Sequence, residues 1–140
     1  SMFYPSGDDA EAIIARTDAG DTAQAAVDYV RAAVRNPSSY YVWGGNGPSG
    51  FDCSGLMLYM FAGVGIKLPR SSGEQYKVGR KITADQALPG DLLFYGPAGS
   101  QSVALFVGNG QMIGVSDTAV AVSPVQTTDM APYLSRIIEW

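Results

Sequence analysis

The chain has 140 residues, of which 46% are hydrophobic, so it is long and apolar enough to fold as one compact domain. Its formal net charge is −4 and it carries no basic stripe, which argues against nucleic acid as a partner. One cysteine and no histidine exclude an internal disulfide and predict neither a metal site nor a cofactor, and no apolar run is long enough to span a membrane.

Residues 1–22 are predicted to form an acidic N-terminal leader, because five acidic side chains there oppose only Arg16. Two interpretations stay open for this leader: a flexible linker, or a segment that lies over a binding groove and contacts basic residues further along. The folded domain is predicted over residues 23–140. Ser1 and Met2 resemble a cloning remnant and no signal peptide follows them, so we expect a targeting segment to have been removed.

Helices are predicted in the first part of the domain. Thr22 is a suitable N-cap for a helix over residues 23–35, which has one apolar stripe. A glycine-rich loop over 44–50 leads to a helix over Cys53–Ala62, which is apolar nearly all round and is therefore expected to be central. A short helix over Ser72–Val78 lies in a basic segment. The cations of that segment are Lys67, Arg70, Lys77, Arg80 and Lys81.

Short apolar or alternating runs, separated by turn residues, predict strands from residue 89 onward. Helices followed by an antiparallel meander indicate an α+β domain in which the helices pack on one face of the sheet. The expected strands are Asp91–Tyr95, Val103–Val107, Gln111–Val115, Ala119–Val125 and Arg136–Trp140.

Cys53 is the most informative residue, because it begins the predicted apolar helix immediately after a tight turn. A thiol at a helix N-terminus is a typical catalytic nucleophile, and the usual partner that returns a proton to the leaving nitrogen is an imidazole. This chain has the thiol and lacks any imidazole. A second interpretation is that Cys53 is simply a small buried residue at the start of a helix.

Five blocks of sequence, in this order, resemble the NlpC/P60 family of papain-like cysteine peptidases, which cut the peptide stems of bacterial peptidoglycan. The resemblance covers about residues 23–140 and is strongest to the mycobacterial Rip group, in particular to a member regarded as non-catalytic. It implies an α+β, papain-like fold with N-terminal helices on a central antiparallel sheet of about five or six strands. The blocks are Tyr41-Val42-Trp43-Gly44-Gly45, Asp52-Cys53-Ser54-Gly55-Leu56, Leu68-Pro69-Arg70-Ser71-Ser72, Pro89-Gly90-Asp91-Leu92-Leu93-Phe94 and Val103-Ala104-Leu105-Phe106-Val107-Gly108.

The same resemblance assigns three catalytic positions, and two of them depart from the family pattern. Cys53 occupies the nucleophile position. Ser102 stands where the family has the general-base histidine, and Gly114 stands where a polar residue orients that histidine. A hydroxyl is far too weak a base to replace an imidazole, so the resemblance implies an inactive site.

Substrate-binding roles also follow from the resemblance. Tyr41 is expected to face the nucleophile, and Asp52 and Ser54 to contact the amino end of a stem peptide, although either is also a suitable helix cap. Arg70 is expected to hold a stem-peptide carboxylate, although the basic segment around it can equally be a solvated face. Ser71 and Ser72 complete the expected set.

These expectations favour a non-catalytic domain that binds peptidoglycan stem peptides at the bacterial cell surface, as a secreted monomer. The alternatives are a slow cysteine endopeptidase that acts on the same stem peptides through another base, and a protein–protein module that docks on a true cell-wall hydrolase.

Overall fold

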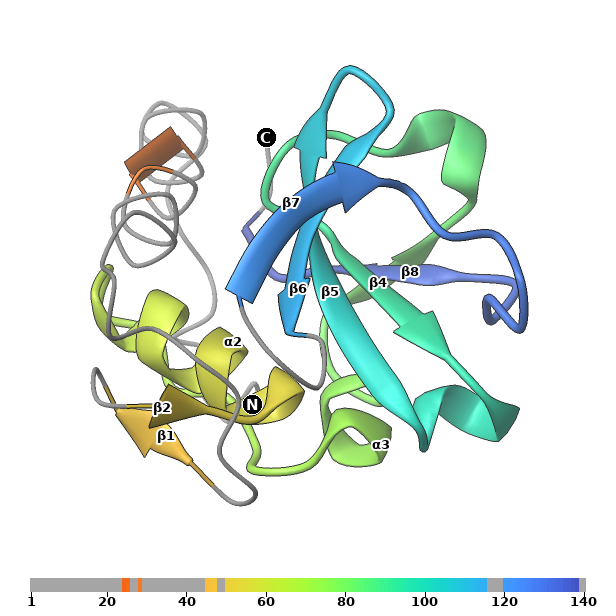
Figure 1. The fold of residues 1–140 in the computed structure, drawn as a ribbon. Coiled ribbons are helices and arrows are strands. Elements are labelled where there is room, and N and C mark those ends of the chain that lie inside the picture. Colours follow the sequence, from red (N-terminus) through yellow and green to blue (C-terminus); the bar gives the residue numbers. More distant parts are fainter. Residues whose placement is uncertain (1–23, 26–27, 29–44, 48–49, 116–119, 139–140) are drawn as a thin grey trace.

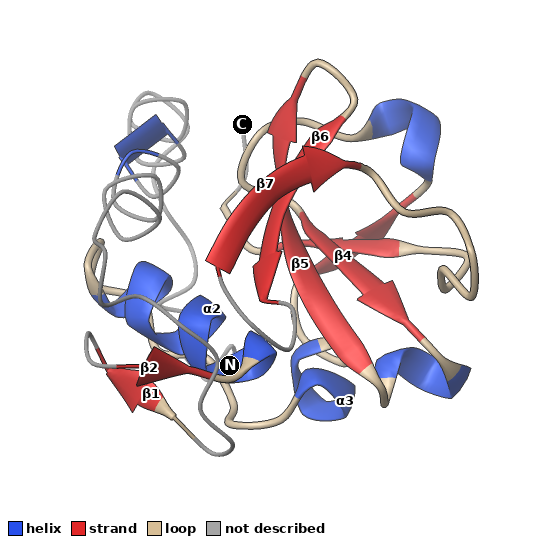
Figure 2. Cartoon of the chain, viewed as in Figure 1, coloured by secondary structure: helices blue, strands red, loops and turns tan. Residues whose placement is uncertain are grey.

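The computed structural model describes residues 24–25, 28, 45–47, 50–115 and 120–138 (Figure 1). Its largest element is an antiparallel sheet of six strands, with helices gathered beside it (Figures 1 and 2). In spatial order the strands are β3 (Arg80–Ile82), β8 (Leu134–Arg136), β4 (Leu92–Tyr95), β5 (Ser102–Gly108), β6 (Gln111–Val115) and β7 (Val120–Pro124). No helix in these ranges is both long and apolar enough to cross a bilayer.

Helix α2 (Cys53–Ala62) covers one face of this sheet. Asp52 is its N-cap, and at its other end the Gly63 N–H is bonded to the carbonyls of Tyr59 and Met60. Leu56, Met57, Met60 and Phe61 of α2 are completely buried against apolar residues of the central strands. The sequence pattern therefore correctly predicts a central, buried helix.

The two faces of the sheet belong to two apolar clusters, because side chains alternate along each strand. On β4, Leu92 and Phe94 face α2, whereas Leu93 and Tyr95 belong to the second cluster. On β5, Val103, Leu105 and Val107 face α2, and Ala104 belongs to the second cluster. The sheet is thus packed on both sides.

Short elements complete the fold. They are the two-stranded ladder of β1 (Asn46–Gly47) and β2 (Gly50–Phe51), helix α3 (Ser72–Gln75), and the 3-10 turns η2 (Ala84–Gln86) and η3 (Pro97–Gly99). Figure 1 shows α3 next to the beginning of β5, at the same end of the molecule as the start of α2. The starts of α2, α3 and β5 therefore lie close together, and the candidate site is formed there.

A buried ion pair joins β8 to the turn before β4, its neighbour in the sheet. The Arg136 guanidinium on β8 donates to both carboxylate oxygens of Asp91, over 3.0 Å to Oδ1 and 2.8 Å to Oδ2. Asp91 is 1% exposed and also accepts the Leu88 N–H, while Arg136 donates to the Gln86 carbonyl. The pair fixes the turn before β4 against β8, the last strand that the structure describes.

Several sequence expectations need correction. The strand predicted over Arg136–Trp140 needs correction: the last described strand is Leu134–Arg136, in which the buried Arg136 pairs with Asp91, residues 137–138 are outside any strand, and residues 139–140 lie outside the described part. Helix α3 ends at Gln75 rather than at Val78, and β3 was not predicted. The strands are also not a simple meander, since β8 lies between β3 and β4.

Other expectations lie largely outside the described residues. Of the helix predicted over 23–35, the structure describes only residues 24, 25 and 28, which are helical. The leader over residues 1–22 is outside the described part entirely.

Candidate functional site

An open pocket of about 370 Å³ lies where the start of α2, the segment before α3 and the start of β5 meet. It brings together seven of the nine residues predicted for the site. Ser100, Gln101 and Val115 also line it, and sequence reasoning missed them because no motif marks them. The lining residues are Asp52, Cys53, Ser54, Arg70, Ser71, Ser72, Ser100, Gln101, Ser102 and Val115.

Gly45 packs closely on the first turn of α2, which begins with Cys53. The Asp52 N–H donates to the Gly45 carbonyl over 2.8 Å, and the Asp52 carboxylate accepts the Gly55 N–H over 2.7 Å. A Cβ on Gly55 would lie 1.9 Å from the Gly45 oxygen, so only glycine fits there. Cys53 itself is half-buried and has no disulfide partner.

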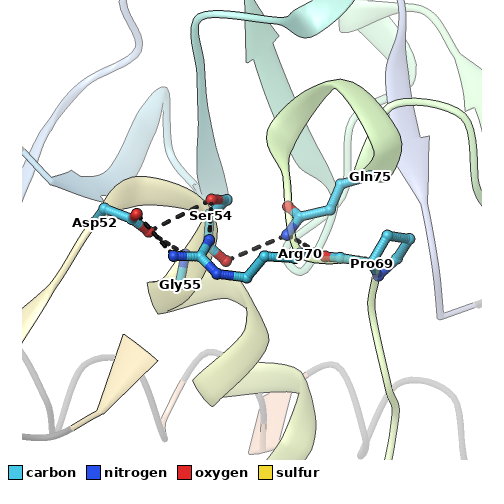
Figure 3. Close-up of polar contacts among 6 residues, drawn as sticks. All are labelled: Asp52, Ser54, Gly55, Pro69, Arg70 and Gln75. Carbon is cyan, nitrogen blue, oxygen red and sulfur yellow. Dashed lines mark hydrogen bonds and ion pairs between the residues drawn. The ribbon is translucent and has the colours of Figure 1, made fainter. Parts of the chain in front are cut away.

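Asp52, Ser54 and Arg70 form a hydrogen-bonded group on one wall of the pocket (Figure 3). One Arg70 Nη donates to the Ser54 hydroxyl over 2.7 Å, and the other forms an ion pair with Asp52 Oδ2 at 2.9 Å. The Ser54 hydroxyl in turn donates to Asp52 Oδ1 over 3.4 Å. The helix-cap interpretation of Asp52 is therefore confirmed, and Arg70 is tied to the cap.

Gln75 supports the backbone beneath Ser54 and Arg70. Sequence reasoning missed it because it is a polar residue buried in a short helix. Its side chain is completely buried, and its amide nitrogen donates to the carbonyls of Pro69 at 2.9 Å and Ser54 at 3.2 Å (Figure 3). Its amide oxygen has no partner among the described residues. One side chain thus links the backbone before Arg70 to the first turn of α2.

Serine hydroxyls form much of the remaining lining. Ser71 is the N-cap of α3, since its hydroxyl accepts the Glu74 N–H over 3.2 Å and donates to the Glu74 carboxylate over 3.1 Å. Ser72 is 6% exposed. Among the described residues of the pocket, only Asp52, Cys53 and Arg70 are ionisable.

The structure places the two positions assigned to the base and its orienting residue on one face of the sheet. Ser102 is the first residue of β5 and lines the pocket. Gly114 lies on β6 and is not a lining residue, but a Cβ on it would meet the Cβ of Ala104 at 3.4 Å. Because Ala104 and Ser102 are two residues apart on β5, side chains at 102 and 114 would project to the same side.

Two further findings delimit the site. Tyr41 lies outside the described residues, so its expected role stays a prediction. Within the described part of the chain, no three His, Cys, Asp or Glu side chains come together in a way that could hold a metal ion.

The sequence pattern of the NlpC/P60 family matches residues 38–139, which is most of the chain. The chain belongs to the NlpC/P60 family. Members of this family with curated names include the peptidoglycan endopeptidase RipA of Mycolicibacterium smegmatis, which is 52% identical over 131 residues. That match covers 82% of this chain and 26% of RipA. Peptidoglycan endopeptidase RipB of Mycobacterium tuberculosis is 48% identical over 134 residues, covering 84% of this chain and 56% of RipB.

Solved NlpC/P60 structures share the fold. The peptidoglycan hydrolase RipB of M. tuberculosis superposes with a TM-score of 0.85 at 38% identity, covering 99% of this chain and 76% of RipB. RipD of M. tuberculosis, described as a non-catalytic NlpC/p60 domain protein adapted to peptidoglycan binding, gives 0.71 at 47% identity, covering 82% and 96%. Three structures of RipA, mutated at a cysteine, a histidine and a glutamate, give 0.82–0.83 at 42–43% identity, each covering 91% of this chain and 67% of RipA.

Proposed function

We propose that this domain binds the peptide stems of bacterial peptidoglycan at the cell wall and does not cut them. One observation carries the proposal: the pocket keeps the thiol of Cys53 but has a serine at the base position, in a chain without histidine. Binding depends on the shape and hydrogen-bonding groups of the pocket. Cleavage depends in addition on a group that can accept and return a proton.

Spacing along the chain supports the assignment of the lost positions. The RipA structures are mutated at positions 383, 432 and 444 of that protein, which are the cysteine, the histidine and the glutamate respectively. The intervals between these positions equal the intervals from Cys53 to Ser102 and from Cys53 to Gly114. The existence of RipD, a relative described as non-catalytic and peptidoglycan-binding, shows that such a fold can serve binding.

The rate lost without a general base is large enough to make efficient cleavage improbable on chemical grounds alone. Loss of general acid–base assistance lowers a rate by about 10²–10⁴, and loss of a cooperating catalytic group can lower it by about 10⁶. No other ionisable side chain of the described pocket can take over. Asp52 is already bonded to Arg70 and to the Gly55 N–H, and Arg70 is a permanent cation.

The accessible thiol favours one competing function, a slow cysteine endopeptidase. Cys53 is half-buried and lines the pocket, so it can meet a bound peptide. Turnover by such an enzyme would require a base outside the described residues of the pocket.

Two measurements on the same samples separate these functions. The domain and its Cys53→Ala variant are incubated with insoluble peptidoglycan, the fraction that pellets is measured, and the supernatant is analysed for peptide fragments by mass spectrometry. We expect both proteins to pellet equally and neither to release fragments. Retention no higher than that of an unrelated acidic protein would overturn the proposal, and fragments released only by the Cys53 form would favour the endopeptidase.

A further inference from the structure

We infer that Gln101 is a specificity-determining residue of the pocket: its side-chain amide holds one amide group of the bound stem peptide, accepting the N–H and donating to the carbonyl. This inference rests on the proposed function. It names a ligand group that the pocket binds on the side of η3 and β5, away from Arg70.

The lining of the pocket has two parts that differ in charge. The part from α2 and the segment before α3 holds Asp52 and Arg70, which are paired with each other. The other part carries no charge, and we call it the neutral wall. A neutral ligand group suits this wall better than an ion, because an ion held there would lose hydration without gaining an opposite charge. The neutral wall consists of Ser100, Gln101, Ser102 and Val115.

The side-chain amide of Gln101 is available to a ligand. It is exposed, lines the pocket and has no hydrogen-bond partner among the residues that the structure describes. By contrast, Gln75 donates to two backbone carbonyls and Gln126 donates to the Thr128 carbonyl. One carboxamide carries an acceptor oxygen and a donor nitrogen, which together match the N–H and the carbonyl of a single ligand amide.

Contacts with the preceding turn hold Gln101 in place. Its backbone N–H donates to the Tyr95 carbonyl over 3.0 Å. A Cβ on Gly96 would lie 2.4 Å from the Gln101 Cγ, so the aliphatic part of the side chain rests on the Gly96 backbone. The Gly96 N–H in turn donates to the Asp129 carbonyl over 2.9 Å. A side chain packed in this way loses less conformational entropy on binding than a freely rotating glutamine does.

Ser102 leaves room for a ligand beside Gln101. The RipA structure mutated at a histidine has that histidine at the matching interval from the cysteine, and a serine is much smaller than a histidine. The Ser102 hydroxyl lines the pocket without a hydrogen-bond partner among the described residues, so it can add a bond to the same ligand amide.

The test changes one amide of the ligand at a time. A synthetic stem tetrapeptide that ends in a carboxamide is titrated into the domain by calorimetry. It is followed by peptides in which each backbone amide is replaced singly by an ester, and by one in which a methyl ester replaces the terminal carboxamide. Each replacement removes an N–H and keeps a carbonyl. We expect one of them to weaken binding about 3-fold to 10-fold, the size of one neutral hydrogen bond, and its position distinguishes a backbone amide from a carboxamide.

Variants of Gln101 show whether this side chain binds that amide. Gln101→Met keeps the length of the side chain and removes its amide, so the ratio of amide to ester affinity should fall to about one at the sensitive position. Gln101→Glu keeps an acceptor for the N–H but loses the donor to the carbonyl. We therefore expect it to weaken binding about 3-fold to 10-fold and to retain the ratio. A residue that only fills space would leave the ratio intact in Gln101→Met.

Gln111→Glu is the matched control for the change of charge. Gln111 is an exposed glutamine that begins β6 and does not line the pocket. It lies four residues, or about 13 Å along the strand, from the pocket residue Val115. That distance exceeds the screening length of about 8 Å at physiological salt, so the affinity of Gln111→Glu should stay within about twofold of the unaltered domain. Thermal unfolding checks that all three variants are folded.

The outcomes separate this inference from the proposed function. If Gln101→Met retains the amide-to-ester ratio, or if no ester weakens binding, the inference is overturned, while peptide binding itself still supports stem-peptide recognition. Retention on whole peptidoglycan with no binding of any peptide also overturns the inference. Absence of both kinds of binding overturns the inference and the proposed function together.

Discussion

A Cβ on Gly114 would lie 3.4 Å from the Cβ of Ala104, which is two residues from Ser102 on β5 and therefore projects to the same side of that strand. Apart from its neighbours along the chain, no other atom of the described residues comes within 4 Å of that position. Positions 114 and 102 are diagonal neighbours on paired strands, which is within the reach of long side chains.

The double variant Ser102→His with Gly114→Glu should restore peptidoglycan cleavage, because it supplies a base beside Cys53 and a carboxylate to orient it. Recovery of about 10²–10⁴ over the unaltered domain is the expected size for general acid–base assistance. The measurement is fragment release from peptidoglycan, with Ser102→His alone and the double variant carrying Cys53→Ala as controls. Continued inactivity in a folded double variant would mean that the pocket has lost more than these two side chains.

Gly55→Ala should destabilise the domain strongly, because its methyl group would lie 1.9 Å from the Gly45 carbonyl oxygen. Forced overpacking costs about 1–3 kcal/mol and can cost more against fixed backbone. Gly73→Ala is the matched control, since its Cβ meets only the Ser100 Cα at 3.8 Å and alanine is the better helix former. Urea unfolding should show a lower midpoint for Gly55→Ala only, and equal midpoints would contradict the close packing.

Asp91→Asn should lower the free energy of unfolding by about 3–5 kcal/mol, because it leaves the buried Arg136 guanidinium without its counter-charge. Asp129→Asn is an exposed control for which a change within about 0.5 kcal/mol is expected. Denaturant titration of both variants at neutral pH measures the difference. Similar stabilities would mean that the ion pair contributes little to the fold.

Tyr95→Phe should change how stability depends on alkaline pH. Burial raises the pKa of Tyr95 from its ordinary 10.0 to about 12, and its hydroxyl donates to the Gln126 carbonyl over 2.9 Å. Between these pH values the folded chain keeps a proton that the unfolded chain releases, so stability falls as pH rises through that window. Tyr95→Phe has no phenol to ionise, so its stability lacks this dependence on pH.

At neutral pH the lost hydrogen bond should make Tyr95→Phe less stable by about 0.5–1.5 kcal/mol. That deficit should shrink between pH 10 and about 12, as the tyrosine form loses stability through ionisation. Thermal unfolding at a series of pH values measures the gap, with the exposed Tyr133→Phe as control. A deficit that stays constant over the window would show that Tyr95 is solvated.

Elements with one strong local signal could be predicted from sequence. Helix α2 is predicted with its observed bounds because an apolar run is enclosed by a cap at Asp52 and by Gly63. Strand β6 is likewise predicted with its observed bounds. By contrast β3 is short, has exposed Arg80 and Lys81, and exists only because β8 pairs with it, which no local pattern reveals. Arg136 misled the prediction of β8 because arginine is rarely buried unless it is paired.

The candidate site could be predicted where a motif marks it. Cys53, Arg70 and Ser102 were assigned from sequence blocks, and the structure brings them to one pocket. The hydrogen-bond partners of Arg70 could not be predicted, because Asp52 and Ser54 are 18 and 16 residues away along the chain. The role of Gln75 could not be predicted for the same reason. Its amide donates to two backbone carbonyls that only the tertiary structure brings next to it.

The position of β8 has a consequence for how this polypeptide is made. Strand β8, which leaves the ribosome after the other described strands, is inserted between β3 and β4, two strands that do not pair directly with each other. Until residues 134–136 emerge, β3 has no neighbour to pair with and Asp91 has no Arg136. Translation must therefore pass this point before the nascent chain can close its sheet.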